Sequence, residues 1–159
     1  MATEAFAKVE HDYGNGFGSI PQYAVKIDGL VGLSSAASAT IANYIESPFG
    51  EDMIIIDAYM CITTVDATGS ADFDIGIGDD AAMTNAEDTI FNAPSYDTAT
   101  VLKGLVVSGV AGVARPIWKK KGATTNSFIC CQQNGNVDAS SLVYNLILIV
   151  APYAKFQAT

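Results

Sequence analysis

Apolar and polar residues alternate with a period of two along several stretches of this chain, most clearly between residues 53 and 77. In MIIIDAYMCITT the even-numbered positions from 54 to 62 are all apolar, and in ADFDIGIG the odd-numbered positions from 71 to 77 are apolar. Because successive side chains of a strand point to opposite faces, this pattern predicts half-buried antiparallel strands. Asp66 and Gly69 between them are typical turn residues, so we expect the two strands to form a hairpin.

Two stretches before this predicted hairpin also have strand character. Residues 21–28 (PQYAVKID) alternate in the same way and predict a first short strand. Residues 38–50 (SATIANYIESPFG) are ambiguous, since Ile41 and Ile45 lie four apart in an Ala-rich segment that permits a short amphipathic helix. Alternation that ends at Ser47-Pro48 favours a strand, and we expect one there.

The second half of the chain resumes the pattern after an acidic, turn-rich stretch. That stretch is expected to be a long loop carrying either a short helix or a brief strand near residues 86–91. Residues 101–113 read as strand interrupted by spaced glycines, which suit bulges or close backbone contacts. Residues 127–134 read as a strand ending at an Asn-Gly turn, and residues 142–151 as a last strand that is apolar on both faces.

These segments predict the fold class. About eight strands with turn signals between them, and no convincing long helix, indicate an all-β protein, an antiparallel β-sandwich of jelly-roll type. Residues 1–20, with a glycine-rich stretch that has no usable period, are expected to form a flexible N-terminal arm. Residues 21–159 are then expected to form a single domain.

Composition adds an expectation about partners. Half of the 159 residues are hydrophobic and only 16% are charged, so part of the apolar strand surface is expected to be buried against other copies in a homo-oligomer. The net charge of −9 argues against binding of nucleic acid, which requires a basic stripe to neutralise phosphates.

Membrane insertion and disulfides are not expected either. The longest apolar run, residues 142–151, is far shorter than the roughly 20 residues that span a bilayer, and the N-terminal segment has no apolar signal-peptide core. Three cysteines make an odd count, and the adjacent Cys130 and Cys131 are poor disulfide partners in a strand. A reducing compartment is the simpler interpretation.

Residues with catalytic or ligating chemistry are sparse. The one histidine, His11, lies in the predicted arm, so a base for Cys61 is available only if the arm folds back, and we favour a buried or interface role for that thiol. Aspartates and glutamates of the acidic loop 79–88, with Asp72 and Asp74, could collect calcium, but a solvated outer face is favoured. We therefore expect no cofactor and no catalysis.

The densest cationic stretch lies at residues 115–121, RPIWKKK. Three interpretations are open. The stretch could be a basic strand end whose lysine stems cover Trp118, or it could dock onto an acidic protein surface, for example that of another copy of the chain. It could also bind nucleic acid, with Trp118 stacked on a base. The overall acidity of the chain disfavours the last alternative.

The order of features from residue 38 to 153 resembles the small jelly-roll structural proteins of tailed-bacteriophage virions. The shared features are a proline–aromatic corner, a long strand ending in two threonines, a Gly-Ser turn, the ADFDIGIG strand, an acidic loop and an apolar final strand; the first three are Pro48-Phe49, Thr63-Thr64 and Gly69-Ser70. The resemblance rests on this pattern and on no diagnostic motif.

The resemblance implies a non-enzymatic capsid decoration (cement) or head protein, trimeric as such proteins often are, located in virions assembled in the host cytoplasm. Its partners would be copies of itself and the major capsid protein or other virion subunits, with no nucleic acid and no membrane. The residues expected to contact neighbours lie in the arm and in the cationic stretch: Tyr13, Phe17, Arg115, Trp118, Lys119, Lys120 and Lys121. The alternative is a carbohydrate- or ligand-binding β-sandwich module, with Tyr59, Tyr96, Trp118 and Tyr144 as candidates for an aromatic platform.

Overall fold

The structure is a computed structural model that describes residues 4–9, 20–34, 40–66, 72–82, 87–92, 98–104, 115–134 and 138–156. Its strands are β1 (Glu4–Val9), β2 (Gln22–Val31), β3 (Thr40–Glu46), β4 (Met53–Thr64), β5 (Asp72–Gly78), β6 (Glu87–Asn92), β7 (Val101–Lys103), β8 (Ile117–Trp118), β9 (Phe128–Asn134) and β10 (Val143–Pro152). A short 3₁₀ helix, η1 (Tyr153–Phe156), follows the last strand. Among the described residues no helix has the length and apolarity that a membrane span requires.

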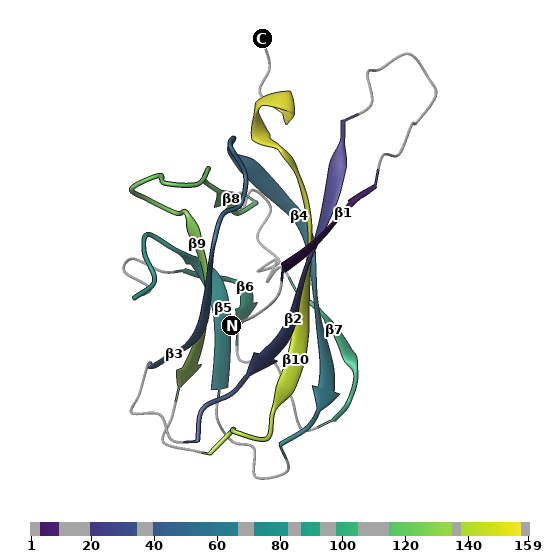
Figure 1. The fold of residues 1–159 in the computed structure, drawn as a ribbon, viewed down its shortest axis with the longest axis vertical. Coiled ribbons are helices and arrows are strands. Elements are labelled where there is room, and N and C mark those ends of the chain that lie inside the picture. Colours follow the sequence, from purple (N-terminus) through teal and green to yellow (C-terminus); the bar gives the residue numbers. More distant parts are fainter. Residues whose placement is uncertain are drawn as a thin grey trace.

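The strands form two antiparallel sheets that lie side by side around one hydrophobic core (Figure 1). The larger sheet has the order β1-β2-β10-β4-β7, with β8 pairing separately with β4. The smaller sheet has the order β3-β9-β5-β6. Inward-facing side chains of both sheets, such as Leu146 and Leu148 from β10 and Ile75 and Ile129 from the smaller sheet, are fully buried in the common core. The expected all-β, antiparallel two-sheet architecture is confirmed.

Strands far apart in the sequence pair with one another in a nested series. β2 pairs with β10, β3 with β9, β4 with β7, and β5 with β6, always antiparallel. Each outer pair encloses the next, so the first and last long strands of the described chain lie next to each other. The last strand, β10, thereby becomes a central strand of the larger sheet, between β2 and β4.

The predicted hairpin between residues 53 and 77 is wrong, although both of its strands exist. β4 belongs to the larger sheet, where β10 lies on one side and β7 and β8 lie on the other, whereas β5 belongs to the smaller sheet between β9 and β6. Alternation reports which face of a strand is buried, and it contains no information about which strand lies alongside.

The faces of β4 also differ from the expected even-numbered set. Ala58, Met60 and Ile62 are buried as expected, but toward the start of the strand the buried residues are Met53 and Ile55. The register with β10 shifts between Ile149 and Val150, so that Ile56 is an extra residue in β4. This β-bulge reverses the alternation, since one inserted residue moves every later side chain to the opposite face.

A second bulge lies in β2, opposite Asn145 of β10. The register shifts there, and Gly29 has a φ of 69° that residues with a Cβ rarely adopt. Its N–H donates to the Oδ1 atom of Asn145 at 2.9 Å. The bulge lets both Ile27 and Leu30, three positions apart, point into the core. It also extends the expected short strand from residue 28 to Val31.

The other segment expectations have mixed outcomes. Residues 40–46 form a strand, as favoured, and residues 87–92 form a strand rather than the short helix that was the alternative. Ten strands are present in the described part of the chain, compared with the expected number of about eight for such a sandwich. The two that the pattern did not indicate are the two-residue β8 and β1.

The expected arm is described only at residues 4–9. There the chain forms β1, which pairs with β2 over six residues, from Glu4 opposite Ile27 to Val9 opposite Gln22. The physical reason is that β2 would otherwise present an unpaired row of backbone N–H and C=O groups at the edge of the sheet.

Gly104, directly after β7, is a point where the two sheets approach closely. A Cβ at this position would lie 2.5 Å from ring carbons of Phe91 and 2.8 Å from the carbonyl oxygen of Ile90, both on β6. We expect Gly104→Ala to lower the free energy of unfolding by about 1–3 kcal/mol, because overpacking forces the backbone or the ring to shift. Chemical denaturation measures the change.

Gly50→Ala is the matched control, because a Cβ there meets nothing within 4 Å. Equal denaturation midpoints and slopes for Gly104→Ala and Gly50→Ala would contradict the close contact between the sheets.

Candidate interaction surfaces

The cationic stretch at residues 115–121 lies at one corner of the sandwich. β8 pairs with the start of β4, Trp118 opposite Met53, and the turn that follows folds onto the β3–β4 connection. The N–H of Lys121 donates to the carbonyl of Phe49 at 2.8 Å, and the N–H of Gly122 donates to Oε1 of Glu46 at 3.1 Å. These backbone contacts hold the lysine turn in a defined position.

Trp118 is a core residue, so its expected role as a partner-binding residue is wrong. Its side chain is fully buried, and its indole Nε1–H donates to the carbonyl oxygen of Ser127 at 3.0 Å. The ring of Phe49 packs edge-on against it, with a centroid distance of 5.9 Å and an interplanar angle of 81°. Stacking on a nucleic-acid base, which requires an exposed ring, is excluded for Trp118 in this structure.

Acidic residues lie beside the three lysines and offset their charge. The Nζ atom of Lys119 lies 2.8 Å from Oδ2 of Asp52, and the N–H of Lys120 donates to Oδ1 of the same carboxylate at 3.0 Å. The hydrogen bond from Lys119, followed by that from the Lys120 backbone, lowers the pKa of Asp52 below 3.8. Glu51 lines the same hollow as Asp52, Lys119 and Lys120.

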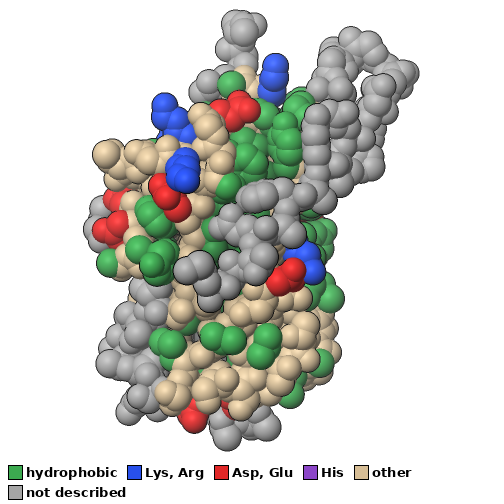
Figure 2. All heavy atoms as spheres, in the orientation of Figure 1, with side chains coloured by type: hydrophobic (Ala, Val, Ile, Leu, Met, Phe, Trp, Pro, Cys, Tyr) green, Lys and Arg blue, Asp and Glu red, His purple; other side chains and the backbone are tan. Residues whose placement is uncertain are grey.

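The corner is therefore less basic than its sequence suggests. Figure 2 shows Lys and Arg side chains toward the end of the molecule that carries η1, with Asp and Glu side chains beside them. Arg115, Lys120 and Lys121 are exposed and available to a partner, whereas Lys119 is half-buried and ion-paired. Tyr13 and Phe17, the expected contact residues of the arm, lie outside the described residues.

A second surface, which the sequence did not single out as a site, is the outer face of the larger sheet. The register places its side chains in rows across the strands. One row runs from Lys26 through Ile147 and Tyr59 to Lys103. The neighbouring rows are Ala24–Ile149–Asp57 and Asn145–Cys61–Val101. The centre of this outer face is thus formed by half-buried isoleucines of β10, which confirms the expectation that the last strand is apolar on both faces.

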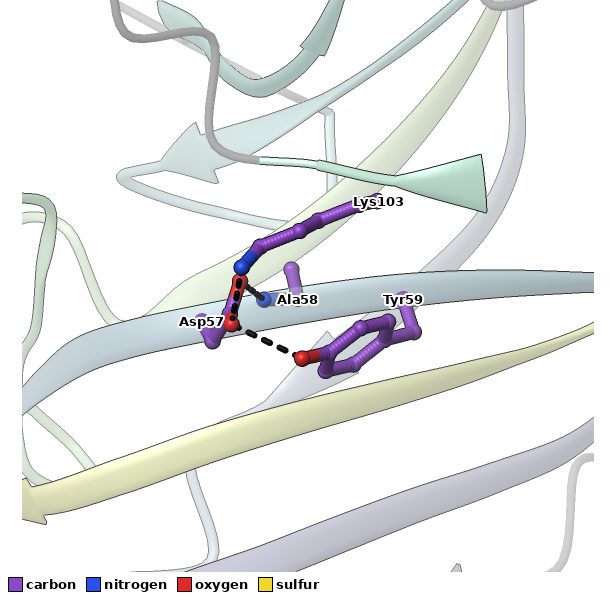
Figure 3. A network of polar contacts seen from close by, with 4 residues as sticks. All are labelled: Asp57, Ala58, Tyr59 and Lys103. Atoms are coloured by element: carbon purple, nitrogen blue, oxygen red, sulfur yellow. Dashed lines mark hydrogen bonds and ion pairs between the residues drawn. The ribbon is translucent and has the colours of Figure 1, made fainter. Parts of the chain in front are cut away.

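Asp57 organises the polar part of the outer face (Figure 3). Its Oδ2 atom accepts the Tyr59 hydroxyl at 2.9 Å and lies 2.9 Å from Nζ of Lys103, and its Oδ1 atom accepts the Ala58 N–H at 3.0 Å. The ammonium of Lys103 also lies 5.8 Å from the centroid of the Tyr59 ring. Asp57 follows the extra residue of the β4 bulge, and bulges of this kind re-aim side chains.

The network shifts the ionisation of its members. Burial by itself raises the pKa of Asp57, but hydrogen bonds from Lys103, Tyr59 and Ala58 outweigh it and bring the pKa below 3.8. The hydrogen bond to Asp57 raises the pKa of the Lys103 ammonium above 10.5. The pair is therefore fully charged near neutral pH, and the Asp57 side chain, only 20% exposed, holds its charge by accepting three donors.

The three cysteines occupy different environments, and all are free thiols. Cys130 and Cys131 point to opposite faces of β9, as expected, and both are fully buried. The Cys130 thiol contacts the carbonyl oxygen of Asp80 at 3.4 Å, and burial raises the pKa of Cys131 to about 12. Cys61 is half-buried on the outer face of the larger sheet. It is thus the one thiol with access to solvent.

The structure also bears on the other sequence candidates. Asp79 accepts the N–H of Asn126 at 2.8 Å and Asp80 accepts the N–H of Ala82 at 2.9 Å, so both carboxylates accept backbone N–H groups. Over the described residues no group of His, Cys, Asp and Glu is arranged to hold a metal ion. Tyr144, like Trp118, is fully buried, so the two do not contribute to an exposed aromatic platform, and Tyr96 and His11 lie outside the described residues.

No protein-family model matches the chain, and no curated protein or solved structure matches it.

Thiol titration checks the environments of the cysteines. A small aromatic disulfide reagent is expected to modify one thiol, Cys61, in the native protein and all three in denaturant, because the other two are fully buried. Cys61→Ser should abolish the native signal. A second thiol reacting at the same rate under native conditions would contradict the burial of β9.

The pH dependence of stability checks the network around Asp57. A carboxyl whose pKa is lowered on folding contributes stability above its unfolded pKa, and that stability is lost as the pH falls through its folded pKa. We expect Asp57→Asn to lower the free energy of unfolding by about 1 kcal/mol at pH 7 and to make the decline below about pH 4 shallower.

Lys103→Gln removes the ion pair and should have an effect in the same direction, because Lys103 supplies the first of the hydrogen bonds that lower the pKa of Asp57. If the free energies of unfolding of the wild-type protein and of Asp57→Asn changed in parallel with pH, this would contradict the lowered pKa of Asp57.

Proposed function

We propose that this protein is a non-enzymatic structural subunit of a tailed-bacteriophage virion, most specifically a decoration (cement) protein that binds and stabilises the capsid shell. Its proposed partners are other copies of the chain, in a homo-oligomer expected to be a trimer, and the major capsid protein or other virion subunits. Its proposed location is the virion, assembled in the host cytoplasm.

The proposal includes a finer assignment of the fold as a jelly roll. Of the described strands, β2 to β7 with β9 and β10 make eight, and these pair first with eighth, second with seventh, third with sixth and fourth with fifth. A long antiparallel hairpin wrapped into two four-stranded sheets has this nesting, which is the arrangement of a jelly roll. The strand orders of both sheets support the assignment.

The observation that carries the proposed function is the outer face of the larger sheet. An antiparallel sheet that faces water on one side is expected to present polar residues there. Here the central strand β10 instead places Val143, Ile147 and Ile149 on the outer face, and β4 adds Ile54 and Ile56. Partly exposed apolar residues on the outer face of a sheet are typical of surfaces that bind other proteins, as a structural subunit requires.

Attachment to capsids tests the function directly. The test uses emptied heads of the phage from which the gene is cloned, prepared without their own copies of the protein. We expect the purified protein to co-sediment with these heads and to raise the temperature at which they disrupt. Heads that sediment without it at both low and physiological salt would overturn the proposed function.

The lysine corner offers a variant for the same experiment. Reversing both exposed charges, Lys120→Glu with Lys121→Glu, is expected to weaken attachment roughly tenfold, and the difference should shrink at high salt because screening weakens exposed charges. Tyr44→Glu, which adds a negative charge on β3 of the smaller sheet instead of in the turn, serves as the control. Equal attachment of the double variant and the wild-type protein at low salt would remove the corner from the contact.

A further inference from the structure

The outer face of the larger sheet has the composition and layout of a protein–protein interface with an apolar centre and a polar rim. Ile147 lies between Lys26 on β2 and Tyr59 on β4, and Ile149 lies between Ala24 on β2 and Asp57 on β4. Charged side chains flank these isoleucines, Lys26 beside Ile147 and Asp57 beside Ile149, and Lys103 on β7 lies next to Tyr59. Fully buried interface cores are apolar and aromatic, and charged residues are concentrated at the rim.

We propose that this outer face binds a second copy of the chain. The inference deepens the proposed function, on which it rests, by naming the contact surface and its occupant. It does not involve the lysine corner, which lies at the end of the sandwich that carries η1.

Charge favours a second copy as the occupant. The four charged side chains that frame the face form two ion pairs within the chain, Lys26 with Asp28 at 2.7 Å and Lys103 with Asp57 at 2.9 Å. These side chains therefore add no net charge, whereas the whole chain carries −9. Two such chains repel each other when their acidic surfaces approach, and a locally neutral face is where a second copy meets the least repulsion.

Several polar groups of the face are already hydrogen-bonded before any partner arrives. Asp57 accepts three donors, Tyr59 donates its hydroxyl, and the Oδ1 atom of Asn145 accepts the N–H of Gly29. Covering these groups with an apolar surface leaves their hydrogen bonds in place, so the desolvation penalty of an unpaired polar group is avoided. The half-buried apolar side chains then contribute the favourable burial.

Cys61 provides a native reporter for this contact. It lies in the row beside Ile147, opposite Asn145 of β10 and Val101 of β7, and Val101 is 61% exposed. A second copy seated on the outer face covers this thiol, while Cys130 and Cys131 are buried in the protomer itself and add no signal. Alkylation of Cys61 therefore measures whether this particular face is covered.

The experiment combines sedimentation velocity with the rate of Cys61 alkylation over a range of concentrations of the full chain. We expect the protein to associate and the alkylation rate to fall at least fivefold over the same concentrations. Ile147→Glu, which places a charge at the centre of the face, should raise the dissociation constant at least a hundredfold and keep Cys61 reactive. Tyr44→Glu is the matched control, because Tyr44 is 58% exposed on β3 of the smaller sheet, and association should not change.

Each outcome bears on the inference separately from the proposed function. Two results would show that another surface joins the copies and would overturn the inference: association that leaves Cys61 equally reactive at all concentrations, or association that Ile147→Glu does not weaken. The proposed role as a structural subunit would remain supported in both cases. A chain that stays monomeric at high concentration would also overturn it, and attachment to capsids would then decide the proposed function on its own. A circular-dichroism spectrum of Ile147→Glu that matches the β-type spectrum of the wild-type protein establishes that the variant is folded.

Discussion

The pairing of β10 with both β2 and β4 is the interaction on which the rest of the structure depends. This strand comes last among the long strands, yet it fills the centre of the larger sheet and supplies Tyr144, Leu146, Leu148 and Val150 to the core. Without it, β2 and β4 have no common neighbour, and the larger sheet separates into two parts. Because β2 and β10 are more than a hundred residues apart in the sequence, their pairing carries a large loop-closure entropy, and non-local pairing of this kind is slow to form.

Two of the three register shifts between β10 and its neighbours decide which side chains near the middle of the sheet face outward. The extra residue Ile56 in β4 moves Asp57 and Tyr59 to the outer face, and the bulge at Gly29 in β2 keeps Ile27 and Leu30 in the core. Both bulges lie against β10, whose own alternation continues without a break up to Val150. The outer face thus combines a regular apolar strand in the middle with bulged neighbours that supply its polar groups, and this combination makes the face suitable as an interface with a satisfied polar rim.

The two surfaces differ in what holds their charges. At the corner, Asp52 and Glu46 accept hydrogen bonds from the backbone of the lysine turn, so acidic residues fix the turn while Lys120 and Lys121 stay exposed. On the outer face, Asp57 and Lys103 are bound to each other. The corner therefore has charge to offer an acidic partner through long-range attraction, and the outer face is suited to close apolar contact. The proposed role, in which the chain binds both its own copies and a shell, would use two such different surfaces.

Much of the candidate surface could be read from the sequence only in part. The two-sided apolar character of residues 142–151 and the isolated charge of Asp57 within an apolar strand were visible, and together they were a signal for an outward-facing site. The ion-pair partner Lys103 was not visible. It lies 46 positions after Asp57 in the sequence, and local alternation contains no information about contacts at that separation. Trp118 shows the opposite error, because a ring beside lysines suggests a surface, whereas Phe49 and the Ser127 carbonyl bury it.

The sequence by itself determined most of the strands, the all-β class, the opposite orientations of Cys130 and Cys131, and the surplus of apolar positions, because each follows from local alternation along an extended backbone. Only the tertiary structure decided that β4 and β5 belong to different sheets, that residues 4–9 join the larger sheet as β1, and where the bulges reverse the faces. Strand partners and register depend on hydrogen bonds and packing between segments distant in sequence, and a period of two is the same whichever strand lies alongside.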